Sequence, residues 1–396
     1  MILLVIHANM AGEGPLSMLG KRWDNRGFFL TAILALAIET GVSIDCVAQA
    51  QPSDAPAPHL SESELISATR QKLAQDAASD SFAGAVLIAH KGKPVFAQAY
   101  GLADRERKIP NTLETRFRIG SMNKMFTAVA ILQLAQQGKL GLDDPLGKYL
   151  TDYPNRDVAT KVTIHHLLTH TGGTGDIFGA EFDAHRLELR TLQDYLKLYG
   201  NRGLGFEPGS RVEYSNYGFI LLGAVVEKVS GESYYDYVRE HVYMPAGMTS
   251  TGSDPKESAV AGLSIGYTAN GEANGVRPNT ALLPYRGTSA GGGYSTVGDL
   301  LKFTNAIQQD RLLNAHYTEL LTVGKVATQG GLIASAFGDY SINGIRCFGH
   351  AGGSFGMNGD LEVCPAPGYV VIVLANMDPP AAELTSLFIS SRLPER

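Results

Sequence analysis

The stretch SMNKMFTAVAILQLAQQ, residues 121–137, carries the clearest pattern in the chain. Its apolar residues recur at helical spacing, as seen at Met125, Val129 and Leu132. Gly138 supplies a stop, so we predict a helix over 121–137. Ser121 and Lys124 open this helix three residues apart. Because three residues make almost one turn, their hydroxyl and amine are expected on the same face.

This S-x-x-K pattern is typical of a nucleophile beside its base. A serine hydroxyl is a weak nucleophile at neutral pH and needs such a base. A lysine can serve where burial and nearby cations hold it partly neutral. The start of the helix adds free N–H groups where an oxyanion would form. Ser253 and Lys256 repeat the spacing, but in a Pro-broken turn without an amphipathic helix, so we read that copy as chance.

A second candidate element is Tyr214-Ser215-Asn216, which lies just before an apolar helix predicted over 219–229. A phenol beside a lysine can exchange a proton with the serine and the leaving group, and an asparagine can orient a substrate amide. The alternative is a packing tyrosine followed by a helix-capping asparagine. Residues 153–155 and 199–201 also fit Y-x-N, so spacing alone does not decide.

The third element is His350-Ala351-Gly352-Gly353, on a predicted strand near the end of the chain. The two glycines let a substrate approach the backbone, and a strand N–H can donate to an oxyanion. His170-Thr171-Gly172 has the same pattern. We set it aside because it precedes the tyrosine and ends a helix-like stretch instead of occupying a strand.

The two ends of the chain contain the predicted strands, and the middle is helical. Helices are expected over 61–77 and 381–391, and strands over 82–90, 94–100, 346–352, 360–364 and 369–374. Between about 120 and 300, short helical patterns are broken by Gly and Pro. This order predicts one sheet closed by the two termini, with an inserted helical lobe.

The order S-x-x-K, Y-x-N, H-x-G resembles the serine β-lactamase and penicillin-binding-protein superfamily. Within it, the chain is most similar to the branch of class C β-lactamases, D-alanyl-D-alanine carboxypeptidases and related esterases. The likeness covers roughly residues 80–378. It implies an α/β, β-lactamase-like fold with an antiparallel sheet flanked by helices. The supporting segments are HHLLTHTGG (165–173), FEPGS (206–210), SAGGGYSTVGDLLKF (289–303) and GHAGGSFGMNGDL (349–361).

The resemblance implies the role of each catalytic residue. Ser121 would be the acylated nucleophile and Lys124 its proton partner. Tyr214 would act as the general base, both for acylation and for activating the deacylating water. The backbone N–H groups of Ser121 and Gly353 would form the oxyanion hole.

The resemblance also implies substrate-binding roles for Asn216, His350, Gly352 and Gly353. Asn216 would hold a substrate amide, and His350 would shape the site and meet a substrate carboxylate. Class C β-lactamases carry lysine where this chain has His350. Because histidine is largely neutral at pH 7 whereas lysine is a permanent cation, we rank carboxypeptidase or esterase activity above β-lactamase activity.

Composition and charge narrow the function classes. The chain has 396 residues, 44% of them hydrophobic, with a net charge of −6 and no Lys/Arg run longer than two, which argues against nucleic-acid binding. Ser289 and Ser354 lie in G-x-S-x-G patterns, but three glycines instead of a helix follow Ser289, and no histidine follows Ser354, so neither fits an α/β-hydrolase. His166 and His170 lack the glutamate and third ligand of a zinc site. We expect no metal and no cofactor.

The N-terminus reads as a secretory signal. Basic residues precede the apolar run 28–38, and Ala48-Gln49-Ala50 follows it. We therefore predict a signal peptide over 1–50, with Met18 as a possible start, then a linker over 51–60 and a hydrolase domain over 61–396. The apolar run is too short to span a bilayer, although an uncleaved anchor is the alternative.

Two cysteines follow the predicted cleavage site, Cys347 and Cys364. A hairpin turning at residues 355–356 would set them opposite each other. They are expected either to form a disulfide or to be two buried thiols.

Together these features predict a secreted or periplasmic serine hydrolase. It would cleave an ester or amide in a small molecule or short peptide through a Ser121 acyl-enzyme, and we favour a carboxypeptidase- or esterase-like enzyme. The alternatives are a class C-type β-lactamase and a catalytically inactive binding module. No sequence feature specifies the acyl group or an oligomeric state.

Overall fold

A computed structural model describes residues 57–272 and 275–395 of the chain. The predicted signal peptide, residues 1–50, lies outside the described residues, as does most of the predicted linker. The described end of that linker contacts the C-terminal segment and the turn at Asn343. The backbone N–H of Leu60 donates to the carbonyl of Arg392 over 3.0 Å, and Asn343 donates to the carbonyl of Ala57 over 2.7 Å.

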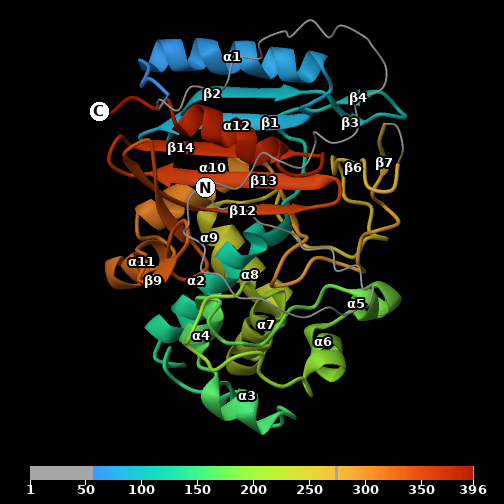
Figure 1. Cartoon of the computed structure of the whole chain (residues 1–396), viewed down its shortest axis with the longest axis vertical. Coiled ribbons are helices and arrows are strands. Elements are labelled where there is room, and N and C mark those ends of the chain that lie inside the picture. The colour runs from blue at the N-terminus through green and yellow to red at the C-terminus, as the bar shows by residue number, and fades with distance from the viewer. Residues whose placement is uncertain (1–56, 273–274, 396) are drawn as a thin grey trace, which may run out of the picture. The chain divides into compact units, whose positions relative to one another are not determined.

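An eight-stranded antiparallel sheet forms the main framework, in the order β2-β1-β14-β13-β12-β11-β10-β9 (Figure 1). As predicted, the N-terminal hairpin pairs with strands from the end of the chain. The strands of this sheet are β1 Gly84–His90, β2 Lys93–Tyr100, β9 Val326–Thr328, β10 Gly331–Ile333, β11 Gly338–Ile342, β12 Ile345–Ser354, β13 Met357–Cys364 and β14 Tyr369–Ala375.

The central strand β14 is apolar on both faces, because helices cover both sides of the sheet. Its side chains alternate between two cores, as the period of two in a strand requires. Val371 and Val373 share one core with residues of α1 (Glu62–Ala78) and α12 (Ala381–Ser390). Ile372 belongs to the other core, with residues of helices from the inserted lobe.

The middle of the chain is the helical lobe that the sequence predicts. Figure 1 shows α3 to α7 gathered at the end of the domain opposite α1. The helices and turns between β5 and β14 are η1 Gly120–Met122, α2 Asn123–Gln136, η2 Leu146–Lys148, α3 Arg156–Lys161, α4 Ile164–Leu168, α5 Ala180–His185, α6 Leu192–Tyr199, α7 Asn216–Ser230, α8 Tyr234–Val238, η3 Arg239–Tyr243, α9 Met244–Ala246, α10 Val297–Gln308 and α11 Ala315–Thr322.

The sequence did not predict strands β9, β10 and β11, which extend the sheet beyond β12. Each strand has three to five residues, and its middle residue is exposed or half-buried, so none contains a hydrophobic run. Three small two-stranded sheets were also not predicted. They pair β3 Leu102–Asp104 with β4 Ile109–Pro110, β5 Phe117–Arg118 with β8 Tyr294–Ser295, and β6 Tyr267–Thr268 with β7 Arg277–Pro278.

Cys347 and Cys364 form a disulfide between β12 and β13. The register pairs Phe348 with Val363 and turns at residues 355–356, which is the hairpin that the sequence predicts. The alternative of two buried thiols is therefore wrong. Among the described residues, no helix combines the length and the apolar character needed to cross a membrane.

Candidate active site

Ser121 lies in the 3-10 turn η1, and Lys124 lies in the first turn of α2. The regular helix therefore begins two residues later than predicted, but the expected pair is together. The Lys124 Nζ donates a hydrogen bond to the Ser121 Oγ over 3.2 Å. Lys124 itself is completely buried.

The amine of Lys124 also donates to two other parts of the chain. Its partners are the Oδ1 of Asn216, at 2.7 Å, and the carbonyl oxygen of Ala290, at 2.5 Å. Burial lowers the pKa of Lys124 to about 7, and the negative charge of Asp176 acts in the opposite direction. The amine is therefore partly neutral at pH 7, so it can accept a proton from a neighbouring hydroxyl.

Tyr214 packs against this lysine and lies just before the N-cap of α7. Its ring centroid is 4.7 Å from the Lys124 Nζ. Burial raises the pKa of Tyr214, while the hydrogen-bonding Ser121 hydroxyl acts in the opposite direction. The phenol therefore carries its proton at neutral pH.

The local sequence explains why Tyr214 and Asn216 both contact Lys124. Ser215 is the N-cap of α7, and its Oγ accepts the backbone N–H of Gly218 over 2.9 Å. The alternative in which Asn216 caps the helix is therefore wrong. Asn216 instead occupies the first helical position, with its side chain buried.

The backbone of β12 reaches the serine turn at Gly352 and Gly353. A Cβ added to Gly352 would lie 2.2 Å from the carbonyl oxygen of Ile119 and 2.8 Å from the backbone nitrogen of Ser121. A Cβ on Gly120 would lie 2.6 Å from the nitrogen of Gly353. Only glycines allow this approach, which brings the backbone N–H groups of Ser121 and Gly353 into one region.

His350 is half-buried on the same strand. Its Nδ1 contacts the carbonyl oxygen of Ala351, so Nδ1–H must be the donor. Burial and then the charge of Lys124 lower the pKa of His350 to about 4. The imidazole is therefore neutral at pH 7 and offers no cation to a substrate carboxylate.

The sequence reasoning missed His170, which it set aside as a repeat of the H-x-G pattern. Although it does not lie on a strand, this buried ring packs 4.4 Å from the ring of Tyr214. Its Nδ1 accepts the backbone N–H of Ser215 over 3.2 Å. Burial, followed by the charges of Lys124 and His350, holds the pKa of His170 well below its usual range. His170 lies in the segment 165–173, which was quoted in support of the family resemblance, so that segment could have identified it.

Asp176 is a second residue that no motif identified. Its Oδ1 accepts the backbone N–H of Asn216 over 3.1 Å, and its Oδ2 accepts the side-chain amide of Asn216 over 3.1 Å. A single aspartate in a glycine-containing loop carries no spacing signal, so only the folded arrangement reveals this contact.

The other candidate motifs have structural roles. Asn155 is the N-cap of α3, and the Tyr153 hydroxyl pairs with that of Tyr217 over 3.1 Å. Tyr199 donates to the carbonyl of Ile177. His166 accepts the backbone N–H of Thr163 as part of a capping box. These contacts explain the residues without catalysis or zinc binding.

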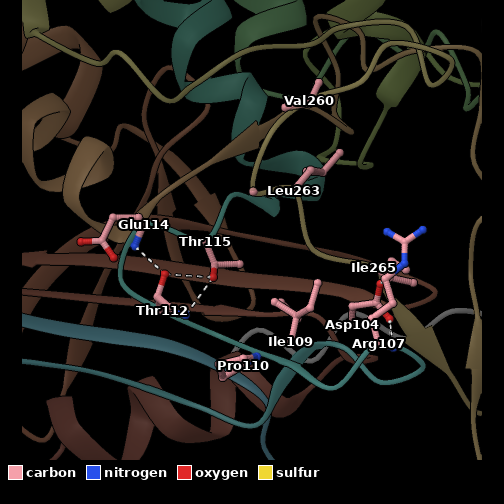
Figure 2. A pocket seen from close by; sticks show the side chains of 12 residues that line it. Asp104, Arg107, Ile109, Pro110, Thr112, Glu114, Thr115, Val260, Leu263 and Ile265 are labelled. Carbon is pink, nitrogen blue, oxygen red and sulfur yellow. Dashed lines mark hydrogen bonds and ion pairs between the residues drawn. The ribbon is translucent and has the colours of Figure 1, made fainter.

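A pocket with a volume of 410 Å³ lies elsewhere on the domain (Figure 2). It contains none of the predicted site residues. Its lining residues are Ala103, Asp104, Arg107, Ile109, Pro110, Thr112, Glu114, Thr115, Val260, Gly262, Leu263 and Ile265.

Comparison with known proteins identifies the family of the chain. The family model described as Beta-lactamase matches residues 69–392. The chain is 30% identical over 301 residues to penicillin-binding protein 4* of Bacillus subtilis, an alignment that covers 73% of this chain and 62% of that protein. It is 32% identical over 257 residues to the esterase EstB of Burkholderia gladioli, covering 57% of this chain and 65% of that protein. The chain thus spans less than two thirds of either relative.

A solved structure gives the same result for the fold. The penicillin-binding protein from Bacillus halodurans superposes with a TM-score of 0.72 at 34% identity, covering 80% of this chain and 97% of that chain. The predicted β-lactamase-like α/β fold is therefore confirmed. The chain belongs to the beta-lactamase family of serine hydrolases.

Proposed function

We propose that this protein hydrolyses an ester or amide through an acyl-enzyme on Ser121, as a carboxypeptidase- or esterase-like member of its family. One observation carries the proposal. The hydroxyl of Ser121 lies 3.2 Å from a completely buried lysine amine whose pKa is lowered to about 7. Acyl transfer needs a nucleophile within hydrogen-bond reach of a base whose pKa lies near the operating pH.

Acylation begins when Ser121 Oγ attacks the substrate carbonyl carbon and its proton passes to the neutral amine of Lys124. The oxyanion that forms is stabilised by the backbone N–H groups of Ser121 and Gly353. The bond to the leaving group then breaks, and the leaving group takes a proton from the Tyr214 phenol. The ammonium of Lys124 returns a proton to Tyr214, so both groups regain their starting forms.

Deacylation follows the same path in reverse, with water in place of the leaving group. Tyr214 passes its proton to the neutral amine of Lys124 and takes the proton of the attacking water. The ammonium of Lys124 then returns a proton to the Ser121 oxygen as the acid product leaves. Because Tyr214 is protonated in the free enzyme, it serves as the general base only after it has passed its own proton on. The general-base role predicted for Tyr214 thus becomes that of a proton relay.

The substrate class follows from the charge of the site. The neutral His350 supplies no permanent cation for a substrate carboxylate, which favours esters and amides without a carboxylate over β-lactams. One of the relatives is named an esterase, which supports the ester class. Neither metal nor organic cofactor is required in this scheme.

We also propose that the protein is exported. Disulfides form and persist in oxidising compartments, and the Cys347–Cys364 disulfide agrees with such a location. The signal-like pattern over residues 1–50 provides the route.

Replacing Ser121 with alanine should abolish turnover, with a loss of about 10⁴-fold or more. The substrates to test are a short-chain nitrophenyl ester, a D-Ala-D-Ala peptide and nitrocefin, and a fluorophosphonate should label only protein that retains Ser121. Ser253→Ala, in the second S-x-x-K pattern, is the matched control and should keep near-normal rates. Undiminished hydrolysis by Ser121→Ala would refute the proposal.

The pH dependence of kcat/KM should show an acid limb near pH 7. The pKa of Lys124 is lowered from 10.5 to about 7, so the neutral amine predominates only above that pH. Lys124→Arg should lose at least about 10²-fold in rate, because a guanidinium stays protonated. The profile is measured with an ester that does not itself ionise between pH 5 and 9. A flat profile down to pH 5 would contradict this role for Lys124.

Export predicts that the mature protein begins at Gln51. It would then lack Trp23, the single tryptophan of the chain, and would show no indole fluorescence. N-terminal sequencing and an emission spectrum of protein from the external fraction test this expectation. An intact N-terminus, or tryptophan emission from that fraction, would argue against cleavage.

A further inference from the structure

We propose that Asp176 is a positioning residue of this site. Its carboxylate fixes the side-chain amide of Asn216, so that the amide oxygen faces Lys124 and one N–H remains free for the substrate. The inference rests on the proposed function, because it assigns a task within the same reaction.

The hydrogen bonds around Asn216 define the orientation of its amide. A carboxylate can only accept, so the Asn216 atom 3.1 Å from the Asp176 Oδ2 must be the nitrogen. On the other side, the Lys124 Nζ lies 2.7 Å from the remaining amide atom, which is the oxygen. Both neighbours therefore favour the same orientation, but only Asp176 excludes the flipped form, because the partly neutral amine of Lys124 could also accept a hydrogen bond from it.

This orientation leaves one donor unused. The amide of Asn216 has two N–H groups, of which Asp176 takes one, while Lys124 occupies the oxygen. The second N–H can donate to a carbonyl oxygen of the bound substrate. Without Asp176, only the Lys124 amine would favour this orientation, and a flipped amide could donate to that amine in its neutral form.

Asp176 is itself held in place before any substrate binds. Its Oδ1 accepts the backbone N–H of Ile177 over 2.7 Å as well as that of Asn216 over 3.1 Å. Arg202 donates to the backbone carbonyl of Asp176 over 2.7 Å and forms an ion pair with Glu181. The loop between α4 and α5 thus presents a preorganised carboxylate to the first turn of α7.

Asp176 also sets the charge that Lys124 experiences. The titratable side chains coupled to the amine are Tyr214, His170, His350 and Asp176. Burial leaves both imidazoles neutral and the phenol protonated at pH 7. The carboxylate of Asp176 is the charge that raises the pKa of Lys124 against the effect of burial. Removing that charge should move the titration of the amine to lower pH.

The direct test replaces Asp176 with asparagine, which keeps the size of the side chain but removes its charge. Its NH₂ group would face either the side-chain amide of Asn216 or the backbone N–H groups of Ile177 and Asn216, a donor against donors in both cases. We expect kcat/KM to fall about 10- to 100-fold and the acid limb to move down by about half a pH unit or more. Asp176→Glu keeps the charge, so its rate should fall while its acid limb stays near that of the wild type.

Asp183→Asn is the matched control, since it removes the same charge from an exposed position on α5. This variant should match the wild type in both rate and pH profile. A thermal unfolding midpoint close to the wild-type value would show that Asp176→Asn is folded.

Two results would overturn the inference. The first is a wild-type rate and pH profile in Asp176→Asn. The second is a loss of rate with an unmoved acid limb, which is the outcome of a merely structural role. Failure of the proposed function would look different, because the wild type would then be unlabelled by fluorophosphonate or Ser121→Ala would remain active.

Discussion

The backbone contact between β12 and the turn that carries Ser121 is the constraint on which the rest of the site depends. At Gly352, even one added carbon would lie 2.2 Å from the carbonyl of Ile119. The contact joins the last part of the chain, which builds the sheet, to the first helix of the inserted lobe. Since the chain ends form the sheet and its middle forms the lobe, the site exists only once the whole domain has folded.

Lys124 is the second element that joins distant segments. Its buried amine contacts the serine turn, the start of α7 and the loop at Ala290, each through a hydrogen bond. Burying an amine is costly unless it is hydrogen-bonded or neutral, and this one is both hydrogen-bonded and close to neutral. The same desolvation that weakens the cation makes the amine a usable base at neutral pH. Stability and chemistry therefore share one physical cause at this position.

Much of this arrangement could be predicted from the sequence, because its signals are local or follow from resemblance. The apolar strand β14, the helix α2 and the hairpin joining Cys347 to Cys364 each have a pattern readable over a few residues. Strands β9 to β11 could not be predicted, because edge strands of three to five half-exposed residues lack hydrophobic alternation. Asp176 was missed for another reason: its partner, Asn216, lies 40 residues away, and a single contact of that kind leaves no motif.

The most direct test of this account is Gly352→Ala, compared with Gly203→Ala, where an added Cβ meets nothing within 4 Å. The account predicts that a methyl group at residue 352 pushes the strand away from the serine turn. The rate kcat/KM should then fall about 10²- to 10³-fold, the effect of losing one oxyanion donor, while near-UV circular dichroism shows a folded protein and the residue 203 variant stays active. Wild-type kcat/KM in folded Gly352→Ala would contradict the claim that this contact builds the site.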